Sequence, residues 1–142
     1  MSSRIPKRAV VTGAASGLGR ALSIELAARG CELLLLDIQE DALAAVKMEV
    51  EGHGVKAEIF AGDVSKMEVL ERAAAHGLET LGPVDFVANN AGVAVSGPFE
   101  DISLEDWEWI GGITLWGVSY GCRAFVPACL RLTLCISPAP LA

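Results

Sequence analysis

Apolar runs alternate with amphipathic segments over residues 8–88 of this chain. The apolar runs are short and show no internal alternation, most clearly at Leu33–Leu36, which is typical of parallel strands covered on both faces. Between these runs, apolar residues recur at helical spacing, for example at Leu43, Val46 and Val50. The expected strands are 8–12, 32–37, 55–61 and 84–88, and the expected helices are 16–29, 39–51 and 65–81. This alternation with short links predicts right-handed βαβ units, and so an α/β fold with a parallel sheet and helices on both faces.

Polar residues mark two helix starts. Ser65 and Glu68 have the spacing of a capping box, in which the serine accepts a hydrogen bond from the third helical amide and the glutamate reaches back. Ser103 similarly precedes a predicted helix over 103–130, about 27 residues or roughly 40 Å long. We expect Pro127 to kink this helix or to mark its final turns.

The predicted long helix is rich in glycine and tryptophan. Its glycines are Gly111, Gly112, Gly117 and Gly121, and its tryptophans are Trp107, Trp109 and Trp116. Each internal glycine costs about 1 kcal/mol relative to alanine, so we expect these glycines to permit close packing against another helix. The tryptophans are expected to lie in a core or in a subunit interface.

Composition and charge narrow the possible classes of protein. The chain has 142 residues, of which 52% are hydrophobic and 20% charged, which suits one domain with a core and not a disordered protein. A net charge of −7 without any run of basic residues argues against a nucleic-acid-binding surface. The apolar run after Arg4, Lys7 and Arg8 is too short for a secretory signal or a membrane span. We therefore expect a soluble, cytoplasmic protein.

Cysteine and histidine spacing gives little support for a metal site or a disulfide framework. The four cysteines are Cys31, Cys122, Cys129 and Cys135, and no two of them form a CxxC pair. His53 and His76 have no nearby ligand partner in the sequence. Buried thiols and solvated histidines near helix ends are expected instead, with no metal bound.

The strongest chemical signal is the stretch Thr12–Gly19, TGAASGLG, between the first strand and the first helix. A glycine-rich turn in this position brings backbone N–H groups and the positive end of a helix dipole close to a ligand, which favours a pyrophosphate. An acid, Asp37, ends the next strand about 20 residues further on, as in dinucleotide-binding folds. The pattern predicts dinucleotide binding; the alternatives are a purely structural turn and a solvated acid at a strand end.

Together with its other motifs, the chain resembles the short-chain dehydrogenase/reductase family from about residue 7 to residue 130. The similar segments are Thr12–Gly19 for the TGxxxGxG cofactor turn, Asp63-Val64 for the position that meets the adenine ring, Asn89–Gly92 for the NNAG motif, and Asp106-Trp107, Gly117 and Pro127 in the long helix. The resemblance implies a Rossmann-type sheet in the strand order 3-2-1-4 that binds a nicotinamide dinucleotide.

The resemblance also implies the cofactor contacts. A carboxylate at Asp37 would accept hydrogen bonds from both ribose hydroxyls of NAD and would repel the 2′-phosphate of NADP. Since no basic residue lies in the glycine turn or directly after Asp37, NAD is expected in preference to NADP. The implied cofactor-binding residues are Gly13, Ser16, Gly17, Leu18, Gly19, Asp37, Asp63, Val64, Asn89, Asn90, Ala91 and Gly92.

The residues of the family's chemistry are missing from this sequence. That chemistry uses a serine and a Tyr-x-x-x-Lys pair, in which the tyrosine donates or removes the hydroxyl proton. The sole tyrosine is Tyr120, the fourth residue after it is Ala124, and no lysine follows Lys66. Thr114 stands where the family has an asparagine, and a hydroxyl cannot reproduce the contacts of an amide. We therefore assign no catalytic residue.

The pattern changes after residue 130. We divide the chain into an incomplete NAD-binding domain over 1–130 and a divergent tail over 131–142. The family has a fifth strand and then its serine at the place of this tail, and the tail does not show that pattern. Ser137 is a poor candidate because Pro138 follows it and it has no tyrosine partner. A fold truncated after the fourth strand and the long helix is expected to leave 84–88 as an unpaired apolar edge. It is also expected to expose a helical stripe that includes Ile110, Ile113, Val118 and Phe125.

Two kinds of function follow. By family, the protein is expected to be an NAD-dependent oxidoreductase that moves hydride between the cofactor and an alcohol or carbonyl carbon, with this chain inactive alone. The alternative is a truncated or splice-variant fragment that binds NAD without catalysis, pairs with a full-length homologue or another copy through the 103–130 helix, or has no function of its own. The expected partners are a dinucleotide and, only in a full-length form, a small alcohol or carbonyl substrate, with neither nucleic acid nor membrane.

Overall fold

Four parallel strands form one sheet in the order β3-β2-β1-β4, which confirms the predicted strand order. The computed structural model describes residues 5–129. The strands are β1 (Arg8–Thr12), β2 (Glu32–Asp37), β3 (Ala57–Ala61) and β4 (Phe86–Ala88). The α-helices are α1 (Gly17–Ala28), α2 (Glu40–Glu51), α3 (Met67–Thr80), α4 (Leu104–Gly111) and α5 (Gly117–Phe125), with a π-helical turn at Gly112–Trp116 and 3-10 turns at Phe99–Asp101 and Val126–Ala128. Within residues 5–129, β4 pairs only with β1 and forms one edge of the sheet.

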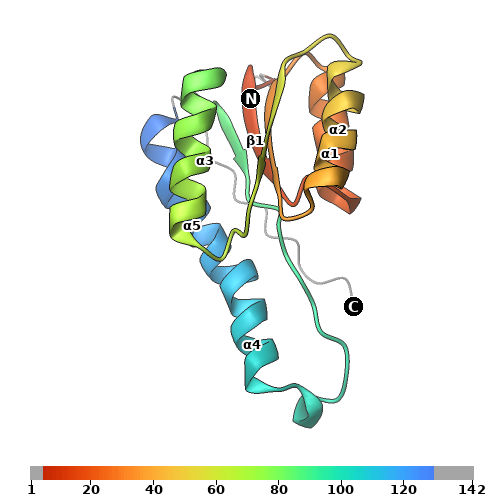
Figure 1. Ribbon diagram of the computed structural model, residues 1–142, viewed down its shortest axis with the longest axis vertical. Helices are drawn as coiled ribbons and strands as arrows, with labels where there is room; N and C mark the ends of the chain where they lie inside the picture. The colour runs from red at the N-terminus through yellow and green to blue at the C-terminus, as the bar shows by residue number, and fades with distance from the viewer. Residues whose placement is uncertain (1–4, 130–142) are drawn as a thin grey trace.

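Helices cover both faces of the sheet. In Figure 1, α1 and α2 lie on one face, and α3 and α5 lie on the other. Leu33 and Leu35 pack into the core beneath the first pair of helices, whereas Leu34 and Leu36 pack into the core beneath the second. All four leucines are at most 1% exposed, as their unbroken apolar run predicts. Because burial of one leucine side chain contributes about 1.5–3 kcal/mol, β2 holds both layers of the fold together.

Two strands begin later than predicted. β3 begins at Ala57 and β4 at Phe86, each two residues after the expected start. Ahead of β4, the Asp85 side chain adds to the main-chain pairing. Its Oδ2 accepts hydrogen bonds from the amides of Lys7 (2.8 Å) and Arg8 (3.2 Å), while the Asp85 amide donates to the carbonyl oxygen of Arg8 at 2.8 Å. Asp85 therefore fixes the start of β4 beside the start of β1.

A capping box is present at one helix start, but not at the one predicted. The N-cap of α3 is Lys66, and no side chain caps this helix. The prediction for Ser65 is wrong because a tight turn holds this residue ahead of the helix, where its amide donates to Asp63 Oδ1 at 2.9 Å. At α4, Ser103 Oγ accepts from the Asp106 amide (3.1 Å), and Asp106 Oδ2 accepts from the Ser103 amide (3.2 Å).

The predicted long helix is interrupted. The π-helical turn joins α4 to α5, and α5 ends at Phe125, where a 3-10 turn containing Pro127 follows. The predicted end at Leu130 lies outside the described residues. A π-helical turn inserts an extra residue and so changes which residues face the sheet. Phe125 is consequently only 3% exposed, and the other three residues of the predicted exposed stripe are half-buried, so that expectation was wrong.

Other large apolar side chains are exposed instead. No residue of α4 is buried, and Figure 1 shows this helix extending away from the sheet. Its exposed apolar residues and those of the π-helical turn, here called the α4 surface, are between 43% and 82% exposed: Leu104, Trp107, Trp109, Leu115 and Trp116. The tryptophans of the α4 surface therefore do not belong to a core within residues 5–129.

The helical glycines pack against loops at the strand ends, and not against another helix as expected. A Cβ atom on Gly117 would lie 3.0 Å from Val64 Cγ2, and one on Gly121 would overlap Asn89 Oδ1. Val64 and Asn89 follow β3 and β4, so α5 crosses directly over the ends of these strands. Gly111 is different, since a Cβ atom there would have open space around it.

Cys31, between α1 and β2, is a buried thiol, as expected. Its Sγ donates to the carbonyl oxygen of Glu32 at 3.4 Å. Burial raises the pKa of the Cys31 thiol from its ordinary 9.0 to about 12, because the thiolate would lose its hydration. Cys122 and Cys129 are half-buried, and Cys135 lies outside the described residues.

The protein is expected to lose stability above pH 9 through Cys31. Between pH 9.0 and about 12 the thiol ionises in the unfolded chain but keeps its proton in the folded one, so rising pH favours unfolding. The contribution is at most about 1.4 kcal/mol per pH unit. Urea unfolding at about pH 8 and about pH 10 should show a smaller loss for Cys31→Ala than for the unaltered protein. Equal losses in both proteins would contradict this assignment.

Candidate cofactor-binding site

A cavity of about 370 Å³ lies at the carboxyl ends of the strands. Ligands of open α/β sheets bind along this edge, where the connections of neighbouring strands run to opposite faces. The residues that line the cavity are Gly13, Ser16, Gly17, Leu18, Asp37, Ile38, Gln39, Asp63, Val64, Asn90, Ala91, Gly92, Val93 and Ile113. Residues that end or follow each of the four strands therefore line one cavity.

The glycine turn after β1 needs its glycines for two reasons. Gly13 and Gly17 have φ angles of 66° and 54°, in the left-handed region that favours glycine. A Cβ atom on Gly13 would lie 2.9 Å from the Cα atom of Ala91, and one on Gly19 would overlap the carbonyl oxygen of Gly13 and lie 2.5 Å from Asn90 Nδ2. The turn, the start of α1 and the loop after β4 therefore meet with no room for side chains.

The N-terminus of α1 is open at the cavity. Its N-cap residue, Ser16, makes no side-chain capping bond, and its first turn contains no acid, whereas α2 begins with Glu40 and Asp41. Ser16, Gly17 and Leu18 all line the cavity. Because the first amides of a helix have no acceptor within it and the positive end of the dipole lies there, an anionic group fits this position.

A buried hydrogen-bond network links the glycine turn to the loop after β4. Thr12 Oγ1 accepts from the amides of Asn90 (3.0 Å) and Ala91 (2.9 Å). Asn90 Nδ2 donates to the carbonyl oxygens of Thr12 (3.1 Å) and Gly13 (3.3 Å). Thr12 and Asn90 are 2% and 8% exposed. These bonds fix one wall of the cavity against the other.

Two carboxylates line the cavity. Asp37 Oδ2 accepts from the amide of Ala15 (3.0 Å), and its Oδ1 accepts from the amide of Gln39 (3.1 Å). Asp63 Oδ1 accepts from the amide of Ser65 (2.9 Å). None of the described lining residues is a lysine or an arginine. The end of the cavity beside β2 and β3 is therefore acidic, while the end beside α1 is suited to an anion.

The structure brings ten of the twelve sequence-predicted site residues to this cavity. The two exceptions are Gly19, which lies beneath the glycine turn, and Asn89, which is buried beside α5 with its Nδ2 3.5 Å from Cys122 Sγ. Leu18, in the first turn of α1, is 60% exposed at the cavity. It turns away from the core because the first turn of α1 begins at the cavity's rim.

Four lining residues were absent from the predicted site: Ile38, Gln39, Val93 and Ile113. Ile38 and Gln39 directly follow Asp37, so their position at a strand end was a usable signal. Val93 likewise directly follows the NNAG segment. Ile113 lies in the π-helical turn, and only the tertiary arrangement of that turn brings it to the cavity.

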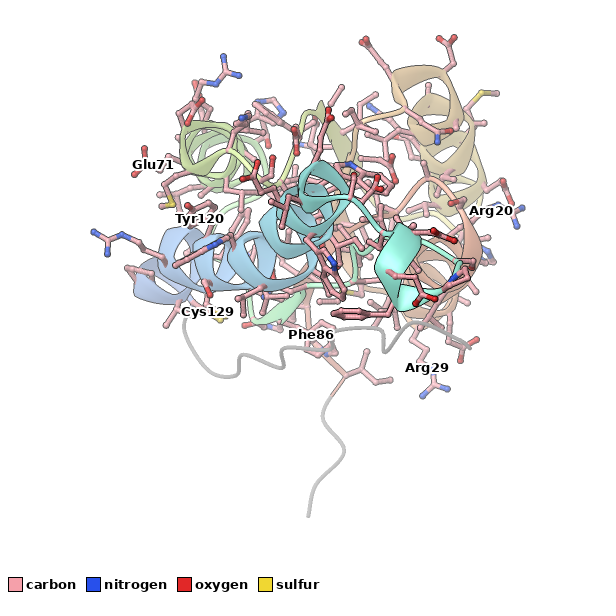
Figure 2. All side chains as sticks on the ribbon, turned by 90° about the horizontal axis from the view of Figure 1, so that it is seen from below. Arg20, Arg29, Glu71, Phe86, Tyr120 and Cys129 are labelled. Carbon is pink, nitrogen blue, oxygen red and sulfur yellow. The ribbon has the colours of Figure 1, made fainter. Side chains whose placement is uncertain are left out.

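Neither Tyr120 nor Thr114 lines the cavity. Tyr120, on α5, stacks on Trp116 with their ring centroids 5.9 Å apart. Figure 2 shows Tyr120 on the α3 side of the molecule with Glu71, far from Arg20 at the start of α1. Thr114 lies in the π-helical turn, where its Oγ1 is buried without a hydrogen-bond partner among the described residues.

Metal-binding and membrane-spanning features were sought in residues 5–129. No three His, Cys, Asp or Glu side chains in this range come together as a metal site would require. His53 is exposed, and His76 is half-buried with its Nε2 3.6 Å from Glu58 Oε2. No helix in the same range has both the length and the apolar character needed to cross a membrane.

Comparisons with known proteins show similar sequences over most of this chain. A family model described as short chain dehydrogenase matches residues 7–132. The 1-deoxy-11-beta-hydroxypentalenate dehydrogenase of Streptomyces avermitilis is 36% identical over 127 residues, which are 88% of this chain and 47% of the relative. The glucose 1-dehydrogenase of Gluconobacter oxydans is 34% identical over 121 residues, 84% of this chain and 46% of the relative. The chain thus spans about half the length of the curated relatives it matches.

Two solved structures are similar in fold as well as in sequence. A short chain dehydrogenase/reductase from Burkholderia phymatum in complex with NAD has a TM-score of 0.86 and 37% identity, over 92% of this chain and 46% of that one. An alcohol dehydrogenase from Thermococcus sibiricus complexed with 5-hydroxy-NADP has a TM-score of 0.84 and 33% identity, over 89% of this chain and 57% of that one. One similar protein is therefore bound to NAD and the other to an NADP derivative.

Proposed function

The chain belongs to the short-chain dehydrogenase family, and from this membership we propose that its described residues bind NAD. The observation that carries the proposal is the cavity at the strand ends, where ten predicted residues meet the open N-terminus of α1. NAD bound there would supply or accept a hydride. We further propose that the whole protein is an oxidoreductase acting at an alcohol or carbonyl carbon, of which these 142 residues form the cofactor-binding half.

The pyrophosphate, the adenosine ribose and the adenine ring of NAD each have a matching group in the cavity. The amides of Gly17 and Leu18, at the positive end of the α1 dipole, would bind the pyrophosphate. Asp37 would accept hydrogen bonds from the ribose hydroxyls, since each carboxylate oxygen can accept more than the one hydrogen bond it already has. Asp63 and Val64 would border the adenine ring. The missing Cβ atoms of the glycine turn leave the backbone accessible to the ligand.

A preference for NAD over NADP is part of the proposal. Asp37 places a carboxylate at the cavity, and no described lining residue is basic. A 2′-phosphate beside Asp37 would therefore meet an uncompensated negative charge, whereas two hydroxyls would meet an acceptor.

Asp37→Ala is expected to lower the ratio of NADP to NAD dissociation constants by at least about tenfold, because a hydrogen bond to a charged group contributes about 1.5–3 kcal/mol. Isothermal titration with both dinucleotides measures this ratio. Asp37→Glu, which keeps the charge, serves as the control and should keep the preference. An unchanged ratio in Asp37→Ala would refute the ribose contact.

Binding and turnover by the purified chain test the proposed function. NAD should bind to the chain, as followed by isothermal titration, and no NADH should form on addition of alcohols, as followed by absorbance. Turnover is not expected because the sequence has no Tyr-x-x-x-Lys pair and no residue that we assign as the family's catalytic serine, and because Tyr120 does not line the cavity. A folded chain that does not bind NAD would refute the first part of the proposal, and NADH formation would refute the second.

A second function, association through the α4 surface, is favoured by its exposed aromatic side chains. Large exposed apolar side chains concentrated in one short stretch of a domain favour an interaction site, and tryptophan is enriched at the centres of protein interfaces. We propose that this surface pairs with another copy of the chain or with a longer homologue.

Trp109→Glu is expected to weaken this association by at least about tenfold, because a charge would have to be buried in an apolar contact. Sedimentation equilibrium over a range of protein concentrations measures the dissociation constant. Met48→Glu is a matched control, because Met48 is 76% exposed on α2, away from the α4 surface. Equal association of both variants and the unaltered chain would exclude this surface as the contact.

A further inference from the structure

The carboxylate of Asp37, at the end of β2, accepts hydrogen bonds from two main-chain amides, one before it and one after it in the sequence. Its Oδ2 accepts from the amide of Ala15 at 3.0 Å, and its Oδ1 accepts from the amide of Gln39 at 3.1 Å. The first of these bonds spans 22 residues and joins the end of β2 to the glycine turn after β1. Hydrogen bonds to an ionised carboxylate are about twice as strong as those between neutral groups, so this bond contributes strongly to holding the glycine turn against β2.

The glycine turn is attached to β2 at two successive residues. The amide of Ala14 donates to the main-chain carbonyl of Leu36 at 3.0 Å, and the amide of Ala15 donates to the Asp37 side chain. Both alanines are buried, at 0% and 7% exposure. The next residues, Ser16–Leu18, line the cavity at the open end of α1. The direction in which the α1 amides point is therefore set by the segment before them. The last hydrogen bond that holds this segment to β2 is the one from the Ala15 amide to Asp37.

We propose that Asp37 is a positioning residue for the pyrophosphate-binding amides, in addition to its proposed contact with the ribose. By holding Ala15, it keeps the amides of Gly17 and Leu18 directed into the cavity. The inference rests on the proposed function, since it concerns the same dinucleotide site. The carboxylate of Asp37 would then have two roles. It would favour NAD over NADP, and it would position the amides that bind the pyrophosphate common to both.

Removal of the Asp37 side chain should change the affinity for a small anion, and the direction of that change distinguishes a positioning role from a purely electrostatic one. If Asp37 acted only through its charge, its removal would make the cavity less negative, and a small anion would bind more tightly. If Asp37 holds the turn, its removal releases Ala15, and the same anion binds more weakly. Asp63 provides the comparison, because it is a second carboxylate at the same cavity whose hydrogen bond goes to Ser65 and not to the glycine turn.

Inorganic pyrophosphate is the probe, because it has no ribose for Asp37 to contact. Titrations of the full chain, followed by the NMR amide shifts of Gly17 and Leu18, are expected to show about fivefold weaker binding by Asp37→Ala. Asp63→Ala should bind pyrophosphate as tightly as the unaltered chain or more tightly. Asp37→Asn keeps one acceptor oxygen for Ala15 and should restore most of the binding. Equal or tighter binding by Asp37→Ala would overturn the inference.

Amide hydrogen exchange without added ligand gives a second measurement that does not depend on NAD. In Asp37→Ala the amide of Ala15 should exchange at least about tenfold faster, while the amide of Ala14, bonded to Leu36, keeps its protection and reports an intact fold. In Asp37→Asn the Ala15 amide should stay protected. Unchanged exchange at Ala15 in Asp37→Ala would refute the positioning role even if NAD binds. Loss of protection there would support that role even in a chain that does not bind NAD.

Discussion

Gly19→Ala is expected to abolish NAD binding and to lower the free energy of unfolding by about 3 kcal/mol. The new Cβ atom would overlap the carbonyl oxygen of Gly13 and lie 2.5 Å from Asn90 Nδ2, and neither can move easily. The first is main chain in a turn with left-handed φ at Gly13, and the second is 8% exposed and hydrogen-bonded to two carbonyls. The start of α1 must therefore move away from β4, and the cavity loses the wall that the pyrophosphate needs.

Two measurements check this result. Isothermal titration should show NAD affinity reduced by at least about a hundredfold, equivalent to about 2.7 kcal/mol. Urea unfolding should show the loss of stability. Gly30→Ala is the control, because Gly30 lies after the other end of α1 with φ 86° and open space around it. It should cost about 1–2 kcal/mol of stability through backbone strain and leave NAD affinity unchanged. Unaltered NAD affinity in Gly19→Ala would refute the position of the site.

Gly121→Ala is expected to destabilise the protein by about 2–3 kcal/mol. A Cβ atom there would overlap Asn89 Oδ1 and lie 2.9 Å from Asn89 Cγ. The Asn89 side chain is 1% exposed, so it has no free volume into which to move. Helix α5 would instead be pushed from the end of β4, with loss of the contacts that bury Phe125.

A second helical glycine provides a control of opposite sign. Gly111 ends α4, and a Cβ atom added there would meet nothing within 4 Å. Gly111→Ala should therefore stabilise the protein by up to about 1 kcal/mol, the difference in helix propensity. Urea unfolding of both variants measures the two effects. A similar change in both would show that the Asn89 contact does not control the packing of α5.

The sheet could be predicted from the sequence because local pattern and tertiary structure agree there. The unbroken apolar run of β2 indicates a strand buried on both faces, and Leu33–Leu36 are buried as expected. The glycine turn, Asp37 and the NNAG segment end or follow strands of one parallel sheet, so their meeting at one edge followed from the predicted order. Their binding of a dinucleotide remains a prediction.

The long helix could not be predicted in the same detail. A π-helical turn has no hydrophobic period of its own, so the sequence did not indicate that the face of the helix changes after Gly111. The glycines at 117 and 121 were expected to contact a helix, but loops at strand ends provide the close contacts. The helix caps were also ambiguous in the sequence, because Ser65 and Ser103 both suit a capping box. Only Ser103 forms one, since the Ser65 amide donates to Asp63 Oδ1 and Ser65 lies in a turn ahead of the helix.

The bonds between Thr12 and Asn90 also bear on the order in which the protein folds. They join residues 78 apart in sequence, whereas β1 and β2 pair residues 24 apart, as Arg8 with Glu32. Closing the longer loop costs more chain entropy, so β4 should dock after the β1-α1-β2 unit has formed. The cavity is then completed in one of the last folding steps. A dinucleotide that needs both walls would bind only chains that have passed this step, and would draw the population toward them by mass action.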